Sequence, residues 1–207
     1  MALPVPRRRF LASLGALVLA ACAPDARHAA LPRGARVIAL GDSLTYGTGA
    51  SPAESWPALL AQRSGWQVEN AGVPGETAAQ ACERLPDLLA ANRPALVLVL
   101  VGGNDFLRRT PDAGVRDALA ACVAEARAAA VPIVLLPVPR LGVGGLANAP
   151  LYAEAAKSLG TPLVDAGLAD ALAKPALRAD AVHPNAAGYR AVAERIGAGL
   201  AKLGFLR

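Results

Sequence analysis

Short apolar runs alternate with longer stretches of helical periodicity from residue 35 to the end of the chain. The run Leu96–Val101 is apolar at every position, which is typical of a strand that is covered on both faces. With four further short runs, each of the five followed by a helix, the pattern predicts a five-stranded parallel sheet with right-handed crossovers in a three-layer α/β/α sandwich. The predicted strands span 37–40, 67–70, 96–101, 133–137 and 162–165, and the predicted helices lie near 54–63, 77–91, 112–130, 149–159 and 185–204.

The size and charge of the chain narrow the possibilities further. With 207 residues, 54% of them hydrophobic and 18% charged, the chain suits one well-buried domain and excludes extensive disorder. A sequence pI of about 9.6 suggests nucleic-acid binding. However, three of the 21 basic residues lie in the acid-free segment 1–21, so 18 bases face 16 acids beyond it. Because no basic cluster with interleaved aromatic residues remains, nucleic acid is rejected as a partner.

The segment 1–22 has the order of a secretory signal. A basic stretch ends at Arg9, an apolar run spans Phe10–Ala21, and small residues precede a cysteine. The apolar run is too short to span a bilayer comfortably. The motif Arg7–Leu11 also resembles a twin-arginine export signal. The protein is therefore expected to be exported to the bacterial periplasm.

Cys22 closes a segment, Leu19–Cys22, that resembles the lipobox of bacterial lipoproteins. The resemblance implies that Cys22 is acylated, becomes the new N-terminus and anchors the protein in a membrane. Ala23 stands where an Asp would favour inner-membrane retention, so the outer membrane is favoured. The alternative is an ordinary cleaved signal with a chance cysteine. The small, aperiodic segment 23–34 is predicted to be a tether, and 35–207 the folded domain.

Four polar segments fall where ligands bind in such folds. Gly41–Leu44, Asn70–Thr77 and Gly102–Asp105 follow the first three predicted strands, and Asp180–Asn185 precedes the last predicted helix. Ligands of open α/β sheets bind at the carboxyl ends of the strands. We therefore expect these segments to meet at one edge of the sheet.

Ser43 is the candidate nucleophile within the first of these segments. A serine hydroxyl is a poor nucleophile until a base within hydrogen-bond reach takes its proton. The chain contains two histidines, and His28 lies in the predicted tether. If the protein is a serine–histidine enzyme, His183 is its base. Taken singly, each residue also has a structural interpretation, because Ser43 could cap a turn and His183 could brace the last helix.

The imidazole of such a base needs an acceptor at its other nitrogen. Asp180, three residues before His183, can turn back to meet it, and Asp165 and Asp170 are rivals for this role. Asn104 with its neighbouring Asp could form an Asx turn after the third strand. Asp42 is assigned a structural role, which is to hold the loop that carries Ser43.

Together and in this order, the four segments resemble the GDSL, or SGNH, hydrolase family, from about Val37 to the C-terminus. The resemblance implies a flavodoxin-like SGNH fold and a serine ester hydrolase with a Ser43–His183–Asp180 triad and an acyl-enzyme intermediate. It also implies an oxyanion hole made by the backbone N–H groups of Ser43 and Gly75 and by the Asn104 amide. Gly72 competes with Gly75. A donor of this kind is commonly worth about 3 kcal/mol.

Cofactors and metals are not expected. One histidine and two separated cysteines in the domain do not make a typical zinc tetrad, and the carboxylates lack the paired spacing of glycosidases. Cys82 and Cys122 lie in predicted helices. Export would permit a disulfide between them, but small buried cysteines are the more ordinary interpretation, and the sequence gives no Cα separation that would decide the question.

The substrate class rests on resemblance. Trp56–Leu60 and Gly75–Thr77 resemble bacterial arylesterases, which overlap with thioesterases and lysophospholipases. A small acyl ester or lysolipid is therefore the expected substrate, and the loop Arg140–Pro150 is expected to line the acyl pocket. One alternative is a deacetylase of cell-envelope carbohydrate. An alternative of another class is a non-catalytic envelope lipoprotein that uses the fold for binding. The sequence does not indicate an oligomeric state.

Overall fold

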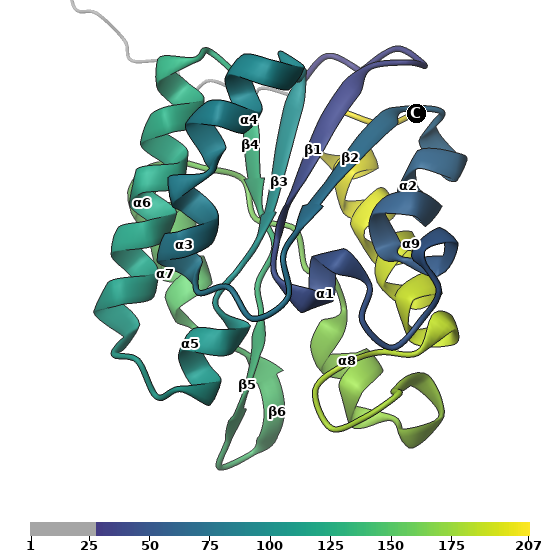
Figure 1. Ribbon diagram of the computed structural model, residues 1–207, viewed down its shortest axis with the longest axis vertical. Helices are drawn as coiled ribbons and strands as arrows, with labels where there is room; N and C mark the ends of the chain where they lie inside the picture. The colour runs from purple at the N-terminus through teal and green to yellow at the C-terminus, as the bar shows by residue number, and fades with distance from the viewer. Residues whose placement is uncertain (1–27) are drawn as a thin grey trace, which may run out of the picture.

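A computed structural model describes residues 28–207, and four parallel strands form its central sheet (Figure 1). The predicted signal and Cys22 lie outside the described residues. The strands are β1 (Arg36–Gly41), β2 (Gln67–Gly72), β3 (Leu96–Leu100) and β4 (Ile133–Leu135), in the spatial order β2-β1-β3-β4. All three neighbouring pairs are parallel, so the predicted α/β/α fold with a parallel sheet is confirmed.

Helices cover both faces of the sheet (Figure 1). On one face lie α3 (Ala78–Glu83), α4 (Leu85–Asn92) and α6 (Asp112–Ala128), with α7 (Leu151–Leu159) against α6. On the other face lie α2 (Trp56–Ser64), α8 (Leu168–Ala173) and α9 (Ala186–Lys202). Two short helices, α1 (Ser43–Tyr46) and α5 (Gly103–Leu107), begin directly beyond the carboxyl ends of β1 and β3, and 3₁₀ turns span Pro52–Glu54 and Pro175–Leu177.

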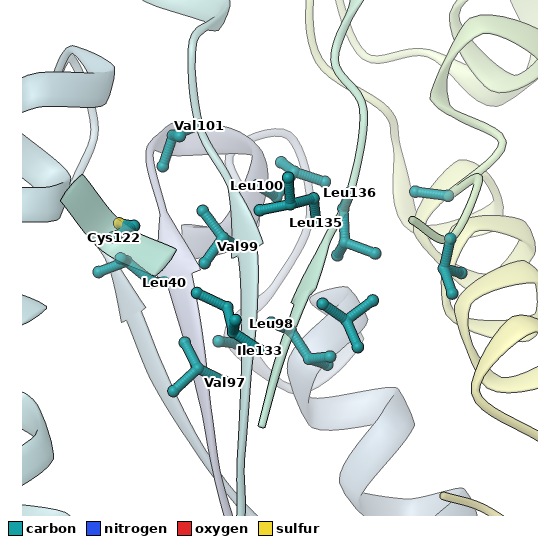
Figure 2. Close-up of a cluster of buried hydrophobic side chains, with 14 of the residues drawn as sticks. Leu40, Val97, Leu98, Val99, Leu100, Val101, Cys122, Ile133, Leu135 and Leu136 are labelled. Atoms are coloured by element: carbon teal, nitrogen blue, oxygen red, sulfur yellow. The ribbon is translucent and has the colours of Figure 1, made fainter. Parts of the chain in front are cut away.

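The core is centred on β3. Each of its five side chains is at most 1% exposed, and Figure 2 shows Val97 to Val101 among leucines from the neighbouring strands. This double-sided burial explains why the segment is apolar at every position rather than alternating. Truncating one of these leucines to alanine would be expected to cost roughly 2–5 kcal/mol.

One predicted helix is two helices. The continuous stretch expected near 77–91 breaks between α3 and α4, where Arg84 ends one helix and caps the next. Pro86 follows at the second position of α4. Because proline has no N–H to donate, it is tolerated in a first turn and disfavoured in a helix interior.

The fifth predicted strand is reduced to a single parallel bridge between Leu135 and Leu163. Val164 N donates to Leu135 O, which continues the ladder for one pair. The chain then turns, because the Asp165 carboxylate accepts the Gly167 N–H at 2.8 Å.

The segment after β4, which includes most of the predicted loop Arg140–Pro150, is a hairpin. Its antiparallel strands are β5 (Pro139–Gly142) and β6 (Gly145–Asn148), joined by two residues. Gly145 has φ +102°, a conformation that glycine adopts without steric cost. The hairpin extends from the carboxyl edge of the sheet, at the bottom of Figure 1.

Residues 28–34, the second half of the predicted tether, lie against the C-terminal segment. The His28 ring stacks on Phe205 with 4.1 Å between centroids, and Leu31 N donates to Phe205 O. The described chain therefore begins beside the C-terminus, at the end of the sheet opposite the hairpin (Figure 1). Within residues 28–207, no helix has the length and hydropathy needed to cross a membrane.

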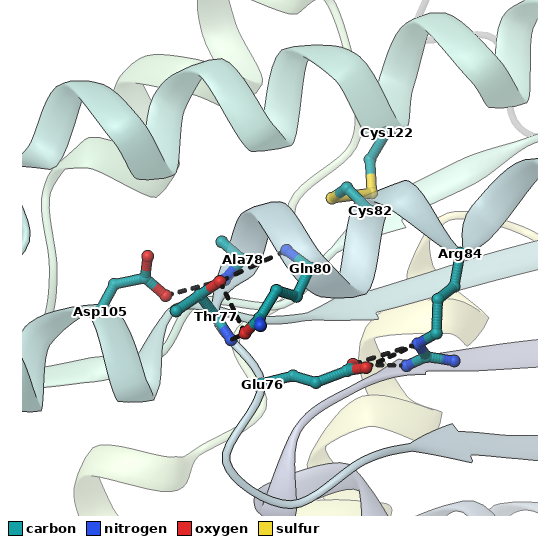
Figure 3. Close-up of a disulfide and its surroundings, with 8 residues drawn as sticks. All are labelled: Glu76, Thr77, Ala78, Gln80, Cys82, Arg84, Asp105 and Cys122. Carbon is teal, nitrogen blue, oxygen red and sulfur yellow. Dashed lines mark hydrogen bonds and ion pairs between the residues drawn. A yellow bond between two sulfur atoms is a disulfide. The ribbon is translucent and has the colours of Figure 1, made fainter.

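Cys82 and Cys122 form a disulfide that joins α3 to α6 across 5.2 Å between their Cα atoms (Figure 3). The question that the sequence leaves open is thus answered in favour of pairing. Both residues are buried, at the packed interface between the two helices.

Candidate active site

Ser43 lies at the first position of α1, directly after the turn that ends β1. Asp42 caps this helix, and its Oδ1 accepts the Leu44 N–H at 2.9 Å. Gly72 packs closely against the turn, because a Cβ there would lie 2.2 Å from the backbone nitrogen of Tyr46. The absence of a side chain at Gly72 is therefore explained by the packing of β2 against α1.

His183 joins the serine to an acidic residue. Its Nε2 lies 2.9 Å from Ser43 Oγ, and its Nδ1 lies 2.8 Å from Asp180 Oδ2. Asp180 Oδ1 accepts the backbone N–H groups of Val182 and His183, both at 2.8 Å. The loop thus folds back on the Asp180 carboxylate, and Ser43, His183 and Asp180 are connected by consecutive hydrogen bonds.

The two rival carboxylates lie elsewhere. Asp165 and Asp170 both pair with Arg195, at 3.2 and 3.1 Å. Asp165 also accepts hydrogen bonds from Asn148 and from the Gly167 N–H. Neither contact involves His183, so the geometry favours Asp180 over both rivals.

Hydrogen bonding favours the charged form of Asp180. Partial desolvation raises the pKa of its carboxyl, but hydrogen bonds from the His183 side chain and from the Val182 and His183 N–H groups hold that pKa below its ordinary value. Asp180 is therefore a carboxylate at neutral pH. A carboxylate at this position stabilises an imidazolium formed when His183 takes a proton.

Asn104 lies in α5, beyond the carboxyl end of β3. Its Nδ2 donates to Glu76 O at 2.9 Å and faces Asp42 Oδ2 at 3.4 Å. Asn104, Gly75 and Ser43 all line the same cavity. The three predicted oxyanion donors are thus close together, as expected for segments that follow neighbouring parallel strands.

Gly75 owes its identity to backbone conformation. Its φ is +87°, and a Cβ at this position would meet nothing within 4 Å. Glycine adopts this positive φ without steric cost, whereas residues with a side chain disfavour it.

The loop that carries Gly75 is fixed at several points, and Figure 3 shows the pair between Arg84 and Glu76. Arg84 binds Glu76 through two nitrogens, at 2.9 Å from Oε1 and 2.7 Å from Oε2, and it also donates to Ala71 O. Such a bidentate pair fixes geometry as well as contributing energy. The Arg108 side chain holds the loop from the other side by donating to Gly75 O at 2.9 Å.

The start of α3 is fixed as well. Thr77 and Gln80 form a reciprocal capping box, and the buried Asp105 carboxylate accepts the Ala78 N–H at 2.8 Å (Figure 3). Sequence reasoning placed Thr77 and Asp105 in the polar segments without assigning them these contacts, and it did not single out Gln80 or Arg84. The Thr-x-x-Gln spacing is a signal that could have found the capping box. No local pattern points to Arg84 or Asp105, because their partners lie across a turn or on another element.

A cavity of about 870 Å³ opens over Ser43 and His183. The predicted loop contributes Arg140, Leu141 and Leu146 to its lining, as the sequence suggests. Arg140 is held by Asp112 at 2.7 Å and lies over the Phe106 ring. The other large apolar lining residues are Leu44, Phe106, Leu107, Val138, Leu172 and Val182. A cavity of this size and character suits an extended acyl chain.

The arrangement can perform nucleophilic acyl transfer. A hydroxyl, a base and an orienting carboxylate are in hydrogen-bond contact, and amide donors flank the hydroxyl on the cavity wall. Across residues 28–207, the His, Cys, Asp and Glu side chains form no group of three or more that could hold a metal ion.

Comparisons with known proteins agree with this chemistry. Residues 39–191 match the model of the GDSL-like lipase/acylhydrolase family. The chain is 34% identical over 158 residues to the protein of Escherichia coli (strain K12) named thioesterase 1/protease 1/lysophospholipase L1, covering 72% of this chain and 75% of that protein. It is 36% identical over 107 residues to esterase TesA of Pseudomonas aeruginosa, covering 49% of this chain and only about half, 53%, of that protein's length.

Solved structures are similar over most of the chain. A crystal structure of TesA superposes with a TM-score of 0.72 at 29% identity, covering 81% of this chain and 99% of that one. The psychrotrophic esterase EstA from Pseudoalteromonas sp., solved with monoethylphosphonate as inhibitor, gives a TM-score of 0.71 at 27% identity. That alignment covers 81% of this chain and 97% of EstA.

Proposed function

The chain belongs to the GDSL-like lipase/acylhydrolase family and is a carboxylic ester hydrolase, and from that premise we propose that it cleaves acyl esters through Ser43, His183 and Asp180. The observation that carries this proposal is the 2.9 Å contact between Ser43 Oγ and His183 Nε2, at the wall of a largely apolar cavity. The same contact argues against the non-catalytic alternative, because a protein that only binds has no need of an activated serine.

The proposed mechanism has two steps. His183 Nε2 takes the Ser43 hydroxyl proton while Ser43 Oγ attacks the carbonyl carbon, and Asp180 stabilises the imidazolium. The tetrahedral oxyanion receives hydrogen bonds from the Ser43 and Gly75 backbone N–H groups and from the Asn104 amide. His183 then protonates the leaving group and an acyl-enzyme remains. Water, deprotonated by His183, attacks the acyl carbonyl and releases the acid, and the proton returns to Ser43.

The cavity supports esters or thioesters of medium-length acyl chains, including lysolipids, as the substrate class. Its volume of about 870 Å³ exceeds what an acetyl group requires, and its large side chains are mostly apolar. The relatives named esterase, thioesterase and lysophospholipase point the same way. A deacetylase of envelope carbohydrate is the weaker candidate, since such an enzyme would need a small acyl site.

We further propose that the protein is exported, with Cys22 as the lipid attachment site. The support is the signal-like order of residues 1–22 and the Leu19–Cys22 motif, which lie outside the described residues. Labelled palmitate should enter the wild-type chain in a bacterial host and should not enter Cys22→Ala. Equal labelling of both chains would contradict the anchor while leaving the esterase proposal intact.

A fluorophosphonate probe tests the proposed nucleophile. The wild type should be labelled and should hydrolyse p-nitrophenyl butyrate and octanoate, whereas Ser43→Ala should do neither while keeping its circular dichroism spectrum. Ser158→Ala is the matched control, because this serine is exposed on α7 and its hydroxyl donates a hydrogen bond to the backbone of its own helix. Near-wild-type turnover by Ser43→Ala would overturn the assignment.

A further inference from the structure

Asp42 connects two parts of the site through its two carboxylate oxygens. Oδ1 accepts the Leu44 N–H at 2.9 Å, within the turn that presents Ser43. Oδ2 faces Asn104 Nδ2 at 3.4 Å, on the short helix that follows β3. The residue is 1% exposed, so both oxygens are shielded from water.

A helix cap alone does not explain a carboxylate at this position. Serine, threonine or asparagine would cap α1 equally well, without the cost of burying a charge. Among residues 28–207, no Lys, Arg or His forms an ion pair with Asp42 that would offset this cost. What a carboxylate adds is a second acceptor oxygen, and that oxygen is the one directed at Asn104.

The Asn104 amide is held from two sides. Its Nδ2 carries two N–H groups; Glu76 O accepts one at 2.9 Å, and Asp42 Oδ2 lies in reach of the other. Gly103 leaves room for this approach, since a Cβ there would lie 3.2 Å from Asp42 Oδ2. The amide plane is thereby fixed between the serine turn and the Gly75 loop.

We propose that Asp42 is a positioning residue for the oxyanion hole. Asp42 holds the Asn104 amide in its donating orientation, and the Asn104 N–H that faces Asp42 is shared with the substrate oxyanion as the oxyanion forms. This inference rests on the proposed function. The longer contact, to Asp42, is the one that yields, while the shorter contact to Glu76 keeps the amide in place. Asp42 therefore acts through Asn104, and it does not touch the substrate.

The protonation of Asp42 provides an independent readout. The titratable groups that influence it are His183 and Asp105, and its charge in turn raises the pKa values of Tyr152 and Tyr189. Burial raises the pKa of Asp42 to about 6, against the lowering effects of the Leu44 N–H and of His183. Below this pH one oxygen becomes a donor, so the hold on Asn104 weakens. The kcat–pH profile should therefore contain an ionisation that belongs to Asp42.

The test is a double-mutant cycle on kcat and KM with p-nitrophenyl butyrate. Asp42→Ser keeps a cap for Leu44 but removes the second acceptor, so kcat should fall roughly 10- to 100-fold. KM should stay within about twofold of the wild-type value, because Asp42 does not touch the substrate and the Asn104 amide that it orients acts on the transition state. Asp42→Asn should behave similarly. The amide has one acceptor oxygen, so it cannot accept hydrogen bonds from both the Leu44 N–H and Asn104 as the two carboxylate oxygens do. The double variant Asp42→Ser/Asn104→Ala should be no slower than Asn104→Ala alone.

Multiplicative losses in the cycle, or an unchanged kcat in Asp42→Ser, would overturn the positioning role. If Asp42→Ser does not fold, Asp42→Asn and the wild-type pH profile decide the question, because the ionisation assigned to Asp42 must disappear in any folded variant that lacks the carboxyl. Failure of the proposed function has a different signature. In that case Ser43→Ala would keep its turnover, or the wild type would hydrolyse no ester at all.

Discussion

Asp180 Oδ2 lies 2.8 Å from His183 Nδ1, while Asp180 Oδ1 accepts the backbone N–H of the same histidine at 2.8 Å. One carboxylate therefore fixes both the ring and the backbone of His183. Its partners are only two and three residues away in sequence, so the loop sets this geometry largely by itself. The rest of the fold then has only to place this loop so that His183 Nε2 lies within hydrogen-bond distance of Ser43 Oγ.

Asp180→Asn should lower kcat by about 10³- to 10⁴-fold, because the amide favours the wrong imidazole tautomer for a base directed at Ser43. Asp170→Asn is the matched control, since Asp170 is an exposed carboxylate paired with Arg195. The measurement is kcat for p-nitrophenyl butyrate at pH 8. Equal losses in the two variants would contradict the role of Asp180.

Asn104→Ala should lower kcat by roughly 10²- to 10³-fold and leave KM nearly unchanged, because an oxyanion donor acts on the transition state. Steady-state kinetics over a range of ester concentrations separates the two parameters. A change confined to KM would instead identify Asn104 as a residue that binds the ground state.

Arg84→Met should lower kcat by about tenfold, because the Gly75 loop loses its bidentate anchor at Glu76 and small displacements of catalytic donors are costly. Arg116→Met removes a comparable ion pair, to Glu154, on the surface of α6 and α7, and it should leave kcat unchanged. Comparing the two variants separates loss of an ion pair from loss of loop position. The same kcat in both would show that the loop does not depend on Arg84.

Asp42 should destabilise the folded protein at neutral pH. Burial raises the pKa of Asp42 from 3.8 to about 6, so between these values the folded state binds more protons than the unfolded state. Stability from this group is therefore greatest in acid, falls as the pH rises toward 6, and stays low above it. The full shift corresponds to about 3 kcal/mol.

Asp42→Asn should thus unfold at a higher temperature than the wild type at pH 8. Loss of the hydrogen bond to Asn104, which the amide NH2 group cannot accept, should reduce this gain. The difference should shrink toward pH 4. Thermal melts at pH 4, 6 and 8 measure it. A stability difference between the two proteins that is the same at pH 4 and pH 8 would refute the raised pKa. Increased stability with reduced kcat would mark Asp42 as a residue whose charge serves catalysis at the expense of stability.

The disulfide should stabilise the domain. Cys82 and Cys122 are 40 residues apart, and closing a loop of that length is worth about 4 kcal/mol on the chain-entropy model. The Cys82→Ala/Cys122→Ala double variant should therefore unfold at lower denaturant concentration. Treating the wild type with reductant in denaturant should reproduce the shift, and the double variant should not respond. Equal midpoints for oxidised wild type and double variant would contradict this contribution.

The position of the candidate active site was predictable because the carboxyl ends of parallel strands lie at the same edge of the sheet. Ser43 and Asn104 follow β1 and β3, which are neighbours in the sheet, so their proximity follows from topology alone. Asp180 and His183 were predictable for a different reason, since three residues of loop suffice to bring them into contact.

Other features depend on distances that no local pattern encodes. The β5–β6 hairpin is short and glycine-rich, and it lacks the alternation that indicates a strand. The disulfide requires a particular separation between two helices. The fixed Gly75 loop depends on Arg84 reaching back over a helix to Glu76, and the role of Asp42 depends on where Asn104 comes to lie.

The stacking of His28 on Phe205 also fixes where the described chain begins relative to the active site. The described chain begins at the amino ends of the strands (Figure 1), whereas Ser43 and Asn104, which line the cavity, follow the carboxyl ends of β1 and β3. Any group attached to the chain before His28 would therefore join the domain at the end of the sheet opposite the residues that line the cavity, where it need not obstruct the entry of substrate.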